Sequence, residues 1–225
     1  MKNRVLVIAT HPDDETLGCG GTLLKHKVND DHIHWLICTN LNKNHKYYPT
    51  REKEIKQVSK IFNFNSVHTL PYETTKVDHY NMSEIIEKIS KIIKKIKPSI
   101  VYLPFMGDVH SDHKKIFEAS YSCTKSFRNL FIKKIYMMET LSETEFAPSI
   151  KKDSFVPNTF VDVSKYINKK IKIMKIYKSE ISKSPFPRSE RSIKALASFR
   201  GSTSGCKYAE SFMLLKEIIW KNNKF

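Results

Sequence analysis

The sequence predicts an α/β protein with a Rossmann-like, three-layer fold, in which helices cover both faces of a mostly parallel sheet. Two observations predict this class. Short β-branched runs alternate with segments whose apolar residues recur at helical spacing. Polar residues of catalytic type follow directly after two of those runs, where open parallel sheets bind their ligands. Because no repeat, low-complexity tract or linker interrupts the 225 residues, we expect one domain, residues 1–225.

The alternation is regular as far as Thr140. Residues 4–10 form a β-branched run without polar alternation, which is typical of a strand buried on both faces. We expect further strands at residues 33–39, 67–70, 100–103 and 131–138, and helices at residues 22–27, 51–62, 82–97 and 112–123. In the 82–97 segment the isoleucines make one helical stripe and lysines fill the other faces, as in a solvated amphipathic helix.

The pattern weakens beyond Thr140. We expect one more strand at residues 159–163, a helix at residues 167–177, a loop at residues 184–187, and a helix that Ser189 caps and that reaches Phe199. After Phe199, Gly201 and Gly205 predict a tight loop that approaches the ligand site.

The chain is strongly basic, with 39 Lys and Arg against 23 Asp and Glu and a net charge of +16. Such a balance permits binding to nucleic acid, anionic lipid or phosphorylated substrates. The lysines are spread along the chain, however, as on solvated helix faces. There is also no basic stripe interleaved with aromatic residues and no recognised nucleic-acid motif, so we expect no nucleic-acid partner.

The compartment is predicted from the first residues and the cysteines. The apolar run at residues 5–9 is far shorter than the ~20 residues that a membrane span needs, and it does not form a signal peptide. The four cysteines lie far apart without a CxxC pair, which excludes a zinc-finger framework and fits reduced thiols. We therefore expect a cytoplasmic protein without a transmembrane segment.

Glycine is scarce and clustered. The chain has six glycines, and three of them, Gly18, Gly20 and Gly21, follow the first strand. A dinucleotide-binding G-x-G-x-x-G pattern would need glycine at the position of Leu23, and no acid ends the second strand, so a nicotinamide cofactor is not expected. We expect these glycines to form a turn that lets the first helix start close beneath the ligand site.

Two polar clusters follow the first strand and the strand that ends at Leu103. The first cluster contains His11, Asp13, Asp14 and Glu15, and the second contains Asp108, His110, Asp112 and His113. Both emerge from the same edge of the predicted sheet, so they can converge in space. Imidazole together with carboxylate suits zinc or another divalent metal, and a catalytic zinc typically keeps three protein ligands and one open position. Of the two adjacent aspartates, one can bind the metal while the other faces a water.

A plainer interpretation of these residues is structural. Asp13, Asp14 or Asp112 could cap a helix, and His110 alone could be a surface histidine. Helix caps do not require five acids and three histidines at two strand ends, which favours the metal site. The other six histidines are not part of such a cluster, and we expect them to be structural or solvated: His26, His32, His34, His45, His68 and His79.

Four segments resemble the PIG-L/LmbE-like superfamily of zinc-dependent N-deacetylases. They are ATHPDDETLGCGGTL at residues 9–23, DVHSDH at residues 108–113, the R-x-x-E pair Arg51 and Glu54, and RGSTSGCKYAESF at residues 200–212. The segments occur in order and span most of the chain. The resemblance implies an LmbE-like fold for the predicted α/β domain.

The resemblance also implies roles for individual residues. His11, Asp14 and His113 would be the metal ligands, and Asp13 the general base. His110 would stabilise the oxyanion and protonate the departing amine, and Asp112 would orient a histidine. Arg51 would hold a substrate hydroxyl or phosphate.

A separate hypothesis concerns the C-terminal segment, where Arg200 and Glu210, together with Tyr208, would contact the substrate from the predicted tight loop. Its alternative is a surface ion pair between Arg200 and Glu210.

The predicted function is therefore a zinc-dependent amidohydrolase. It would remove the acetyl group from an N-acetylated amino sugar that is free, nucleotide-linked or part of a glycan precursor. Zn²⁺ is the expected cofactor, although Fe²⁺ also suits a site with two histidines and one aspartate. The partner would be a small acetamido sugar, and a homo-oligomer is compatible with the resemblance. The alternatives are a metal phosphoesterase, which would usually need a second metal site, and a non-catalytic basic binding module.

Overall fold

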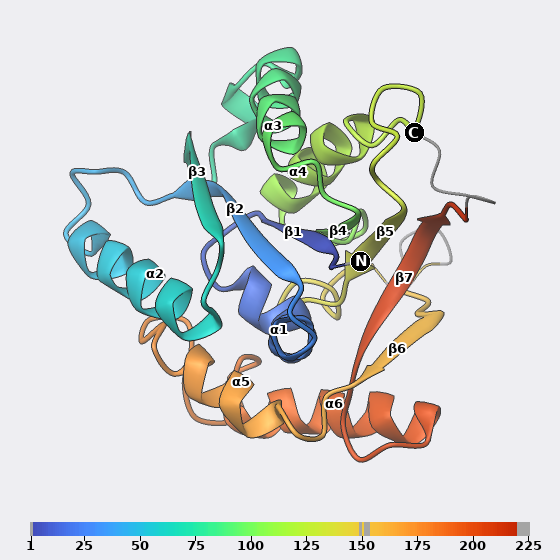
Figure 1. Cartoon of the computed structure of the whole chain (residues 1–225). Helices are drawn as coiled ribbons and strands as arrows, with labels where there is room; N and C mark the ends of the chain where they lie inside the picture. Colours follow the sequence, from blue (N-terminus) through green and yellow to red (C-terminus); the bar gives the residue numbers. More distant parts are fainter. Residues whose placement is uncertain (1, 149, 151–153, 220–225) are drawn as a thin grey trace.

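The computed structural model describes residues 2–148, 150 and 154–219 and has one seven-stranded sheet in the order β3-β2-β1-β4-β5-β7-β6 (Figure 1). The strands are β1 (Arg4–Ala9), β2 (His32–Asn40), β3 (Ser66–Glu73), β4 (Ile100–Leu103), β5 (Lys134–Met138), β6 (Thr159–Asp162) and β7 (Ala209–Glu217). The α-helices are α1 (Asp14–Val28), α2 (Tyr48–Phe62), α3 (Met82–Ile96), α4 (Ser111–Ser122), α5 (Ile167–Met174) and α6 (Glu190–Ser204), and a 3-10 turn, η1, spans Val77–His79.

The sheet is mostly parallel, which confirms the predicted class. Strands β3, β2, β1, β4 and β5 run parallel, while β7 is antiparallel to both β5 and β6. The order of the strands reverses between β1 and β4, because the chain leaves β1 toward β2 and β3 and returns on the other side of β1. In open α/β sheets, ligands bind beyond the carboxyl ends of the strands at this switch point.

Helices cover both faces of the sheet, so the core has two halves (Figure 1). Along β1, Val5 and Val7 pack with α1, α2, α5 and α6, whereas Leu6 and Ile8 pack with α3 and α4. All four side chains are fully buried. A strand covered on both faces needs apolar residues at every position, which explains the unbroken apolar run that predicted it.

The glycines after β1 lie inside a helix, so the predicted turn is wrong. Helix α1 begins at Asp14 and includes Gly18, Gly20 and Gly21, with a kink at Cys19 (φ −144°, ψ 21°). A Cβ atom at Gly18 would lie 2.8 Å from the Cβ of Met138 in β5, and one at Gly21 would lie 2.7 Å from the Cβ of Val163. Glycine is therefore required here because α1 packs closely against the strands.

The C-terminal strand is the second departure from the sequence prediction. Helix α6 continues through Gly201 to Ser204, and only Gly205, with φ 73°, forms the turn. The chain then enters β7, which lies between β5 and β6. Its partners are distant in the sequence, and local periodicity does not reveal such a strand.

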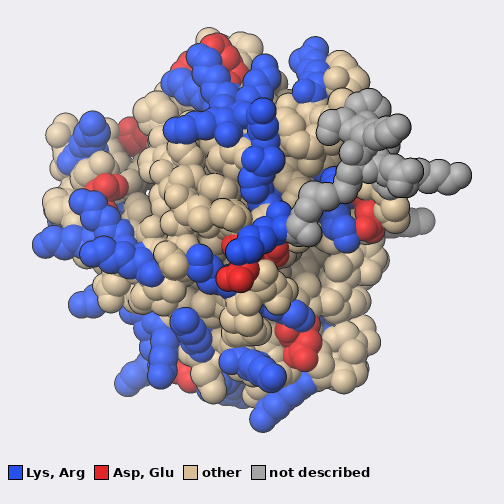
Figure 2. All heavy atoms as spheres, viewed as in Figure 1, with Lys and Arg blue, Asp and Glu red and all other residues tan. Residues whose placement is uncertain are grey.

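The face of the molecule shown in Figure 2 is basic. On the face shown in Figure 2, Lys and Arg outnumber Asp and Glu and are dispersed over several elements. In the part of the chain that is described, no helix is both long and apolar enough to cross a membrane.

The tight packing of α1 predicts a difference between neighbouring glycines. In Gly21→Ala the new methyl group would press on Val163, and we expect a loss of unfolding free energy of about 1–3 kcal/mol. Gly20→Ala is the control, because its methyl group would meet atoms no closer than 3.4 Å. We expect that variant to change stability by less than ~1 kcal/mol. Denaturant unfolding of both variants checks this, and equal stabilities would contradict it.

Candidate active site

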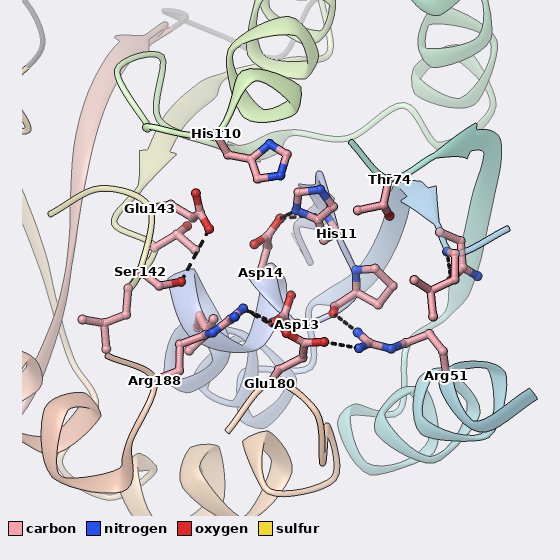
Figure 3. A pocket seen from close by; sticks show the side chains of 16 residues that line it. His11, Asp13, Asp14, Arg51, Thr74, His110, Ser142, Glu143, Glu180 and Arg188 are labelled. Carbon is pink, nitrogen blue, oxygen red and sulfur yellow. Dashed lines mark hydrogen bonds and ion pairs between the residues drawn. The ribbon is translucent and has the colours of Figure 1, made fainter. Parts of the chain in front are cut away.

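A pocket of about 200 Å³ opens beyond the carboxyl ends of β1 and β4 (Figure 3). The first loop, after β1, contributes His11, Asp13 and Asp14, and His110 comes from the loop after β4. Residues 140–143, Glu180 and Arg188 form another part of the wall. The two polar clusters predicted to converge do lie together at the switch point of the sheet.

Three side chains converge at the centre of this site. The Nε2 atom of His113 lies 3.2 Å from Nδ1 of His11 and 3.4 Å from Oδ2 of Asp14, and the last two atoms are 3.9 Å apart. Ligands of a tetrahedral zinc, each ~2.0–2.1 Å from the metal, lie about 3.3–3.4 Å from one another. The spacing of the three atoms therefore fits a small divalent cation.

The other ring nitrogens of His11 and His113 contact carboxylates. These contacts decide the protonation state of the nitrogens that face the centre of the site. Nδ1 of His113 lies 2.8 Å from Asp108, and Nε2 of His11 lies 3.3 Å from Asp112. Since a carboxylate only accepts hydrogen bonds, each of these nitrogens carries the proton and the opposite nitrogen becomes an acceptor. When both rings are neutral, two imidazole lone pairs and one carboxylate oxygen face one another, and these are the ligand atoms of a metal site.

The electrostatics at His113 agree with a cation at this place. Burial opposes a charge on the fully buried ring, but Asp14 and Asp108 together raise the pKa of His113 to about 10. A bound proton and a bound metal are two ways to neutralise the same negative charge, and a metal would displace the proton.

Asp108 and Asp112 are anchored so that they can hold these rings. Asp108 is fully buried and accepts a hydrogen bond of 2.6 Å from the Thr144 hydroxyl. Asp112 accepts from the backbone N–H groups of Thr75 (2.6 Å) and Val77 (3.2 Å). These bonds tie up the side chain of Asp112, so it does not act as a helix cap.

Asp13 has a backbone conformation that is rare outside glycine. Its φ is 128° and its ψ is −26°, and its side chain makes no capping hydrogen bond to α1. The Asp13 N–H donates to Oε2 of Glu15 at 3.0 Å, and the hydroxyl groups of Thr16 and Tyr177 donate to Oε1 of the same carboxylate. Glu15 is fully buried, so this network holds the strained turn in place.

The Asp13 carboxylate is buried but has a cationic partner. Burial, Asp14 and Glu180 raise its pKa well above the ordinary value, while Arg188 and Arg51 act in the opposite direction. Nη1 of Arg188 donates to Oδ2 of Asp13 at 3.2 Å. In the pocket the Asp13 carboxylate lies between Asp14 and the guanidinium group of Arg188 (Figure 3).

His110 is held as a neutral hydrogen-bond donor. Its Nδ1 accepts from the backbone N–H of Asp112 at 3.1 Å, which leaves the proton of the neutral ring on Nε2. Burial and the neighbouring His11 lower the pKa of His110 to about 4. Its ring centroid lies 4.7 Å from that of His11, and the ring lines the pocket.

Arg51 lines the pocket, but other protein groups already bind its guanidinium. Arg51 donates to the carbonyl oxygen of Pro12 at 2.8 Å and forms ion pairs with Glu54 and Glu180. Glu180 in turn forms an ion pair with Arg188 at 3.1 Å. This chain of charges connects the α5–α6 segment to the loop after β1.

Sequence reasoning missed three of the charged residues that line the pocket. Glu180 and Arg188 lie where the secondary-structure pattern is weak, and no motif marks them. Glu143, in the loop after β5, also lines the pocket, and burial raises its pKa to about 7 although His113 opposes the shift. Asp108 was included in the second cluster without a role, and its contact with His113 depends on the folded loop.

The structure places Arg200 and Glu210 elsewhere. Arg200 pairs with Glu139, and Glu210 pairs with Lys170 at 2.7 Å. Neither belongs to the described residues that line the pocket, and they do not form the alternative ion pair with each other. The reason is β7, which carries Glu210 beneath the kink of α1, where the carboxylate accepts from the Gly21 N–H.

The open sheet and this acceptor cluster define an α/β protein with a candidate site for a divalent metal at its switch point. Comparison with known families then identifies the chain. Residues 6–124, which are 119 of 225 residues, match the family described as PIG-L: GlcNAc-PI de-N-acetylase. The chain belongs to this family, as the resemblance in its motifs implied.

Individual relatives share the whole fold at low identity. The chain is 24% identical to a diacetylchitobiose deacetylase of Thermococcus kodakarensis, over 96% of this chain and 84% of that protein. The N,N′-diacetylchitobiose deacetylase of Pyrococcus horikoshii, solved with an inhibitor, has a TM-score of 0.77 at 20% identity and covers 95% of this chain and 84% of its own. The 4-carboxy-2-hydroxymuconate hydratase GalB of Pseudomonas putida has a TM-score of 0.74 at 13% identity, with both chains covered completely. The fold is thus shared by proteins with different reactions.

The contact between Asp108 and His113 predicts an effect on metal affinity. Asp108→Asn removes the negative charge that orients the ring, and loss of such a partner typically weakens metal binding by ~10–100-fold. Titration with a competing chelator measures this. Asp30→Asn is the control, because that side chain is 78% exposed and lies just before β2, at the end of the sheet opposite the cluster. Equal affinities in the two variants would contradict the orienting role of Asp108.

Proposed function

We propose that this protein is a metal-dependent N-deacetylase that hydrolyses the acetamido group of an N-acetylated amino sugar, and that Zn²⁺ is its metal. The observation that carries the proposal is the triangle of acceptor atoms from His11, Asp14 and His113, with a buried carboxylate on one side and a neutral imidazole donor on the other. Membership of the PIG-L family supports the same reaction.

The three acceptor residues would hold the metal. A divalent metal supplies Lewis acidity, both toward a water and toward an amide carbonyl. Two imidazoles and one carboxylate suit Zn²⁺ and also Fe²⁺, so the donor set favours a first-row metal over Ca²⁺ or Mg²⁺.

The side chains around this centre have complementary proton roles. Asp13 accepts a proton from the attacking water, and the adjacent Arg188 stabilises the ionised form of this buried carboxylate. On the other side, Nε2–H of His110 donates to the amide oxygen as negative charge develops there. When the carbon–nitrogen bond breaks, the proton that Asp13 took from the water passes to the departing amine. The resemblance implied His110 for this transfer, but the neutral His110 ring has only its Nε2–H proton and keeps it to stabilise the oxyanion. The acetyl group leaves as acetate.

The charges of the pocket favour an uncharged sugar at the reacting end of the substrate. Among its lining residues are four carboxylates, Asp13, Asp14, Glu143 and Glu180, and two guanidinium groups, Arg51 and Arg188. Both arginines are engaged by carboxylates of the protein, so neither is free to bind a phosphate as the sequence suggested for Arg51. The pocket is also smaller than the ~300–1,000 Å³ typical of drug-sized ligands, which suits one sugar ring.

The alternatives have less support. A second group of metal-binding type among the described residues, His11, His110 and Asp112, shares His11 with the first and is no separate second site, which a two-metal phosphoesterase would need. The hydratase with the same fold shows that architecture alone does not select the reaction. A cytoplasmic location and a single domain stay predictions, and the four free thiols fit the former.

If Asp13 is the base and not a metal ligand, its substitution should lower activity without removing the metal. Asp13→Asn keeps the size of the side chain and can still accept from Arg188, so we expect full metal content. General-base catalysis commonly contributes ~10²–10⁴-fold, and we expect kcat to fall by about that factor. Acetate release and elemental analysis measure the two quantities. Loss of the metal in this variant would mean that Asp13 is a ligand and not the base.

The charge of the pocket predicts the order of substrates. N-acetylglucosamine and N,N′-diacetylchitobiose should be deacetylated with a kcat/KM at least about tenfold higher than N-acetylglucosamine 6-phosphate, which corresponds to ~1.4 kcal/mol. Acetate release at fixed ionic strength measures this ratio. A preference for the phosphorylated sugar would show that the arginines are available to an anion.

A further inference from the structure

A second hollow lies at the opposite end of the sheet from the active site. It has a volume of about 710 Å³ and opens at the amino ends of β1, β2 and β3. Three cationic side chains line it: Lys2, Arg4 and Lys95. His32, His34, His68 and Ser66 line it as well. Three of the histidines that the sequence left as structural or solvated therefore belong to one site.

The hollow arises because two strands extend beyond the helix that covers them. On β2 the side chains of His34, Leu36 and Cys38 alternate onto one face, where Leu36 and Cys38 pack in the same core half as the isoleucines of α3. Helix α3 ends at Ile96, whose side chain lines the hollow. Beyond the end of α3, the same face of the sheet continues with polar side chains in place of apolar ones.

Hydrogen bonds arrange the polar groups in this row. Ser66 is paired with His34 in the register of β2 and β3. Its hydroxyl lies 2.8 Å from Nδ1 of His34 and 3.0 Å from Nε2 of His68. A hydroxyl has one proton to donate and two lone pairs that accept, so Ser66 can hydrogen-bond both rings at once, and at most one ring accepts from it. The serine therefore fixes both rings and leaves their other nitrogen atoms for a ligand.

The charged groups that line the hollow, Lys2, Arg4 and Lys95, are all positive. No carboxylate occurs among the described residues that line it. The acids nearest in sequence are engaged: Asp30 pairs with Lys2 at 3.6 Å, and Asp31 pairs with His26 at 2.7 Å. Burial, followed by the charges of its neighbours His32, His68 and Arg4, lowers the pKa of His34 to about 4.

This charge distribution selects the kind of ligand. A metal cation would be repelled, and within the described chain the clusters with metal-binding spacing all lie at the active site. A tetrahedral oxyanion could accept hydrogen bonds from the imidazoles and also contact the guanidinium of Arg4 and the ammonium of Lys95.

We propose that the hollow lined by Arg4, His34, Ser66, His68 and Lys95 binds a phosphate or sulfate group, independently of the deacetylase pocket. The ligand is an oxyanion, free or as the exposed group of a larger phosphorylated molecule. An oxyanion bound there would be a specific partner for part of the chain's excess positive charge. The active site offers no such partner for that charge.

The test is a titration of the full chain with inorganic phosphate, at ionic strength held constant with chloride, followed by the ring C–H signals of the histidines in NMR spectra. We expect the signals of His34 and His68 to shift saturably, while those of the exposed His45 and His79 do not. The proposal would be overturned if these signals do not move with phosphate at constant ionic strength and move only when the total salt concentration changes. A glucose 6-phosphate titration then distinguishes the sources, because equal affinity shows that a phosphorylated molecule is accepted and weaker binding assigns the site to the free ion.

Charge-matched variants separate this site from the general basicity of the protein. Arg4→Gln with Lys95→Gln should weaken phosphate binding by about two- to thirtyfold, since each lost ionic contact at a solvated site is worth ~0.2–1 kcal/mol. Lys53→Gln with Lys125→Gln removes two exposed charges elsewhere and should leave the affinity unchanged. Equal weakening in the two pairs would overturn the proposal. Acetate release should be the same in all of these variants, which keeps this test separate from that of the proposed function.

The pH dependence gives a second measurement that needs no variant. A bound anion stabilises the imidazolium form, so binding takes up protons and affinity rises as the pH falls. Sulfate remains a dianion in this range, and its affinity should be higher at about pH 5.5 than at about pH 7.5. An affinity that is independent of pH would show that the histidines do not face the anion.

Discussion

Three consecutive acidic residues at the end of β1 are almost completely removed from water, and each of them needs a different partner. Asp13, Asp14 and Glu15 are 3%, 3% and 0% exposed. An unpaired buried carboxylate costs several kcal/mol, so the fold must bring cationic or donor groups to all three. Arg188 lies against Asp13, the two histidines lie against Asp14, and Tyr177 donates to Glu15. Much of the structure around the pocket follows from these pairings.

The pairings connect parts of the chain that are far apart in sequence. Arg188 and Glu180 belong to the α5–α6 segment, and through Arg51 they tie this segment to the start of α2. A second buried pair, Lys170 and Glu210, lies beneath the kink of α1, where Lys170 donates to the Leu17 carbonyl and Glu210 accepts from the N–H groups that follow the kink. The first turns of α1, with the buried acids, are thus held from both sides.

Charge is distributed in opposite senses at the two ends of the sheet. At the carboxyl ends of the strands, carboxylates exceed arginines, and the excess negative charge suits a divalent cation and a neutral sugar. At the amino ends of β1 to β3, cations and imidazoles have no carboxylate among them, which suits an anion. The net charge of +16 describes neither site, because it averages two local fields of opposite sign.

The sequence by itself determined the α/β class, the positions of the first five strands and the convergence of the two polar clusters. These features depend on local patterns: the apolar run at Val5 to Ala9, the isoleucine stripe of α3, and the position of His11 and His110 directly after strands. Chain order is enough to place such residues at one edge of a parallel sheet. Only the tertiary structure decided that β7 lies between β5 and β6, that Arg188 faces Asp13 across 175 residues of sequence, and that His34 and His68 share one serine. These contacts join residues with no common periodicity, and they form because buried charges and open strand edges must find partners wherever the folded chain provides them.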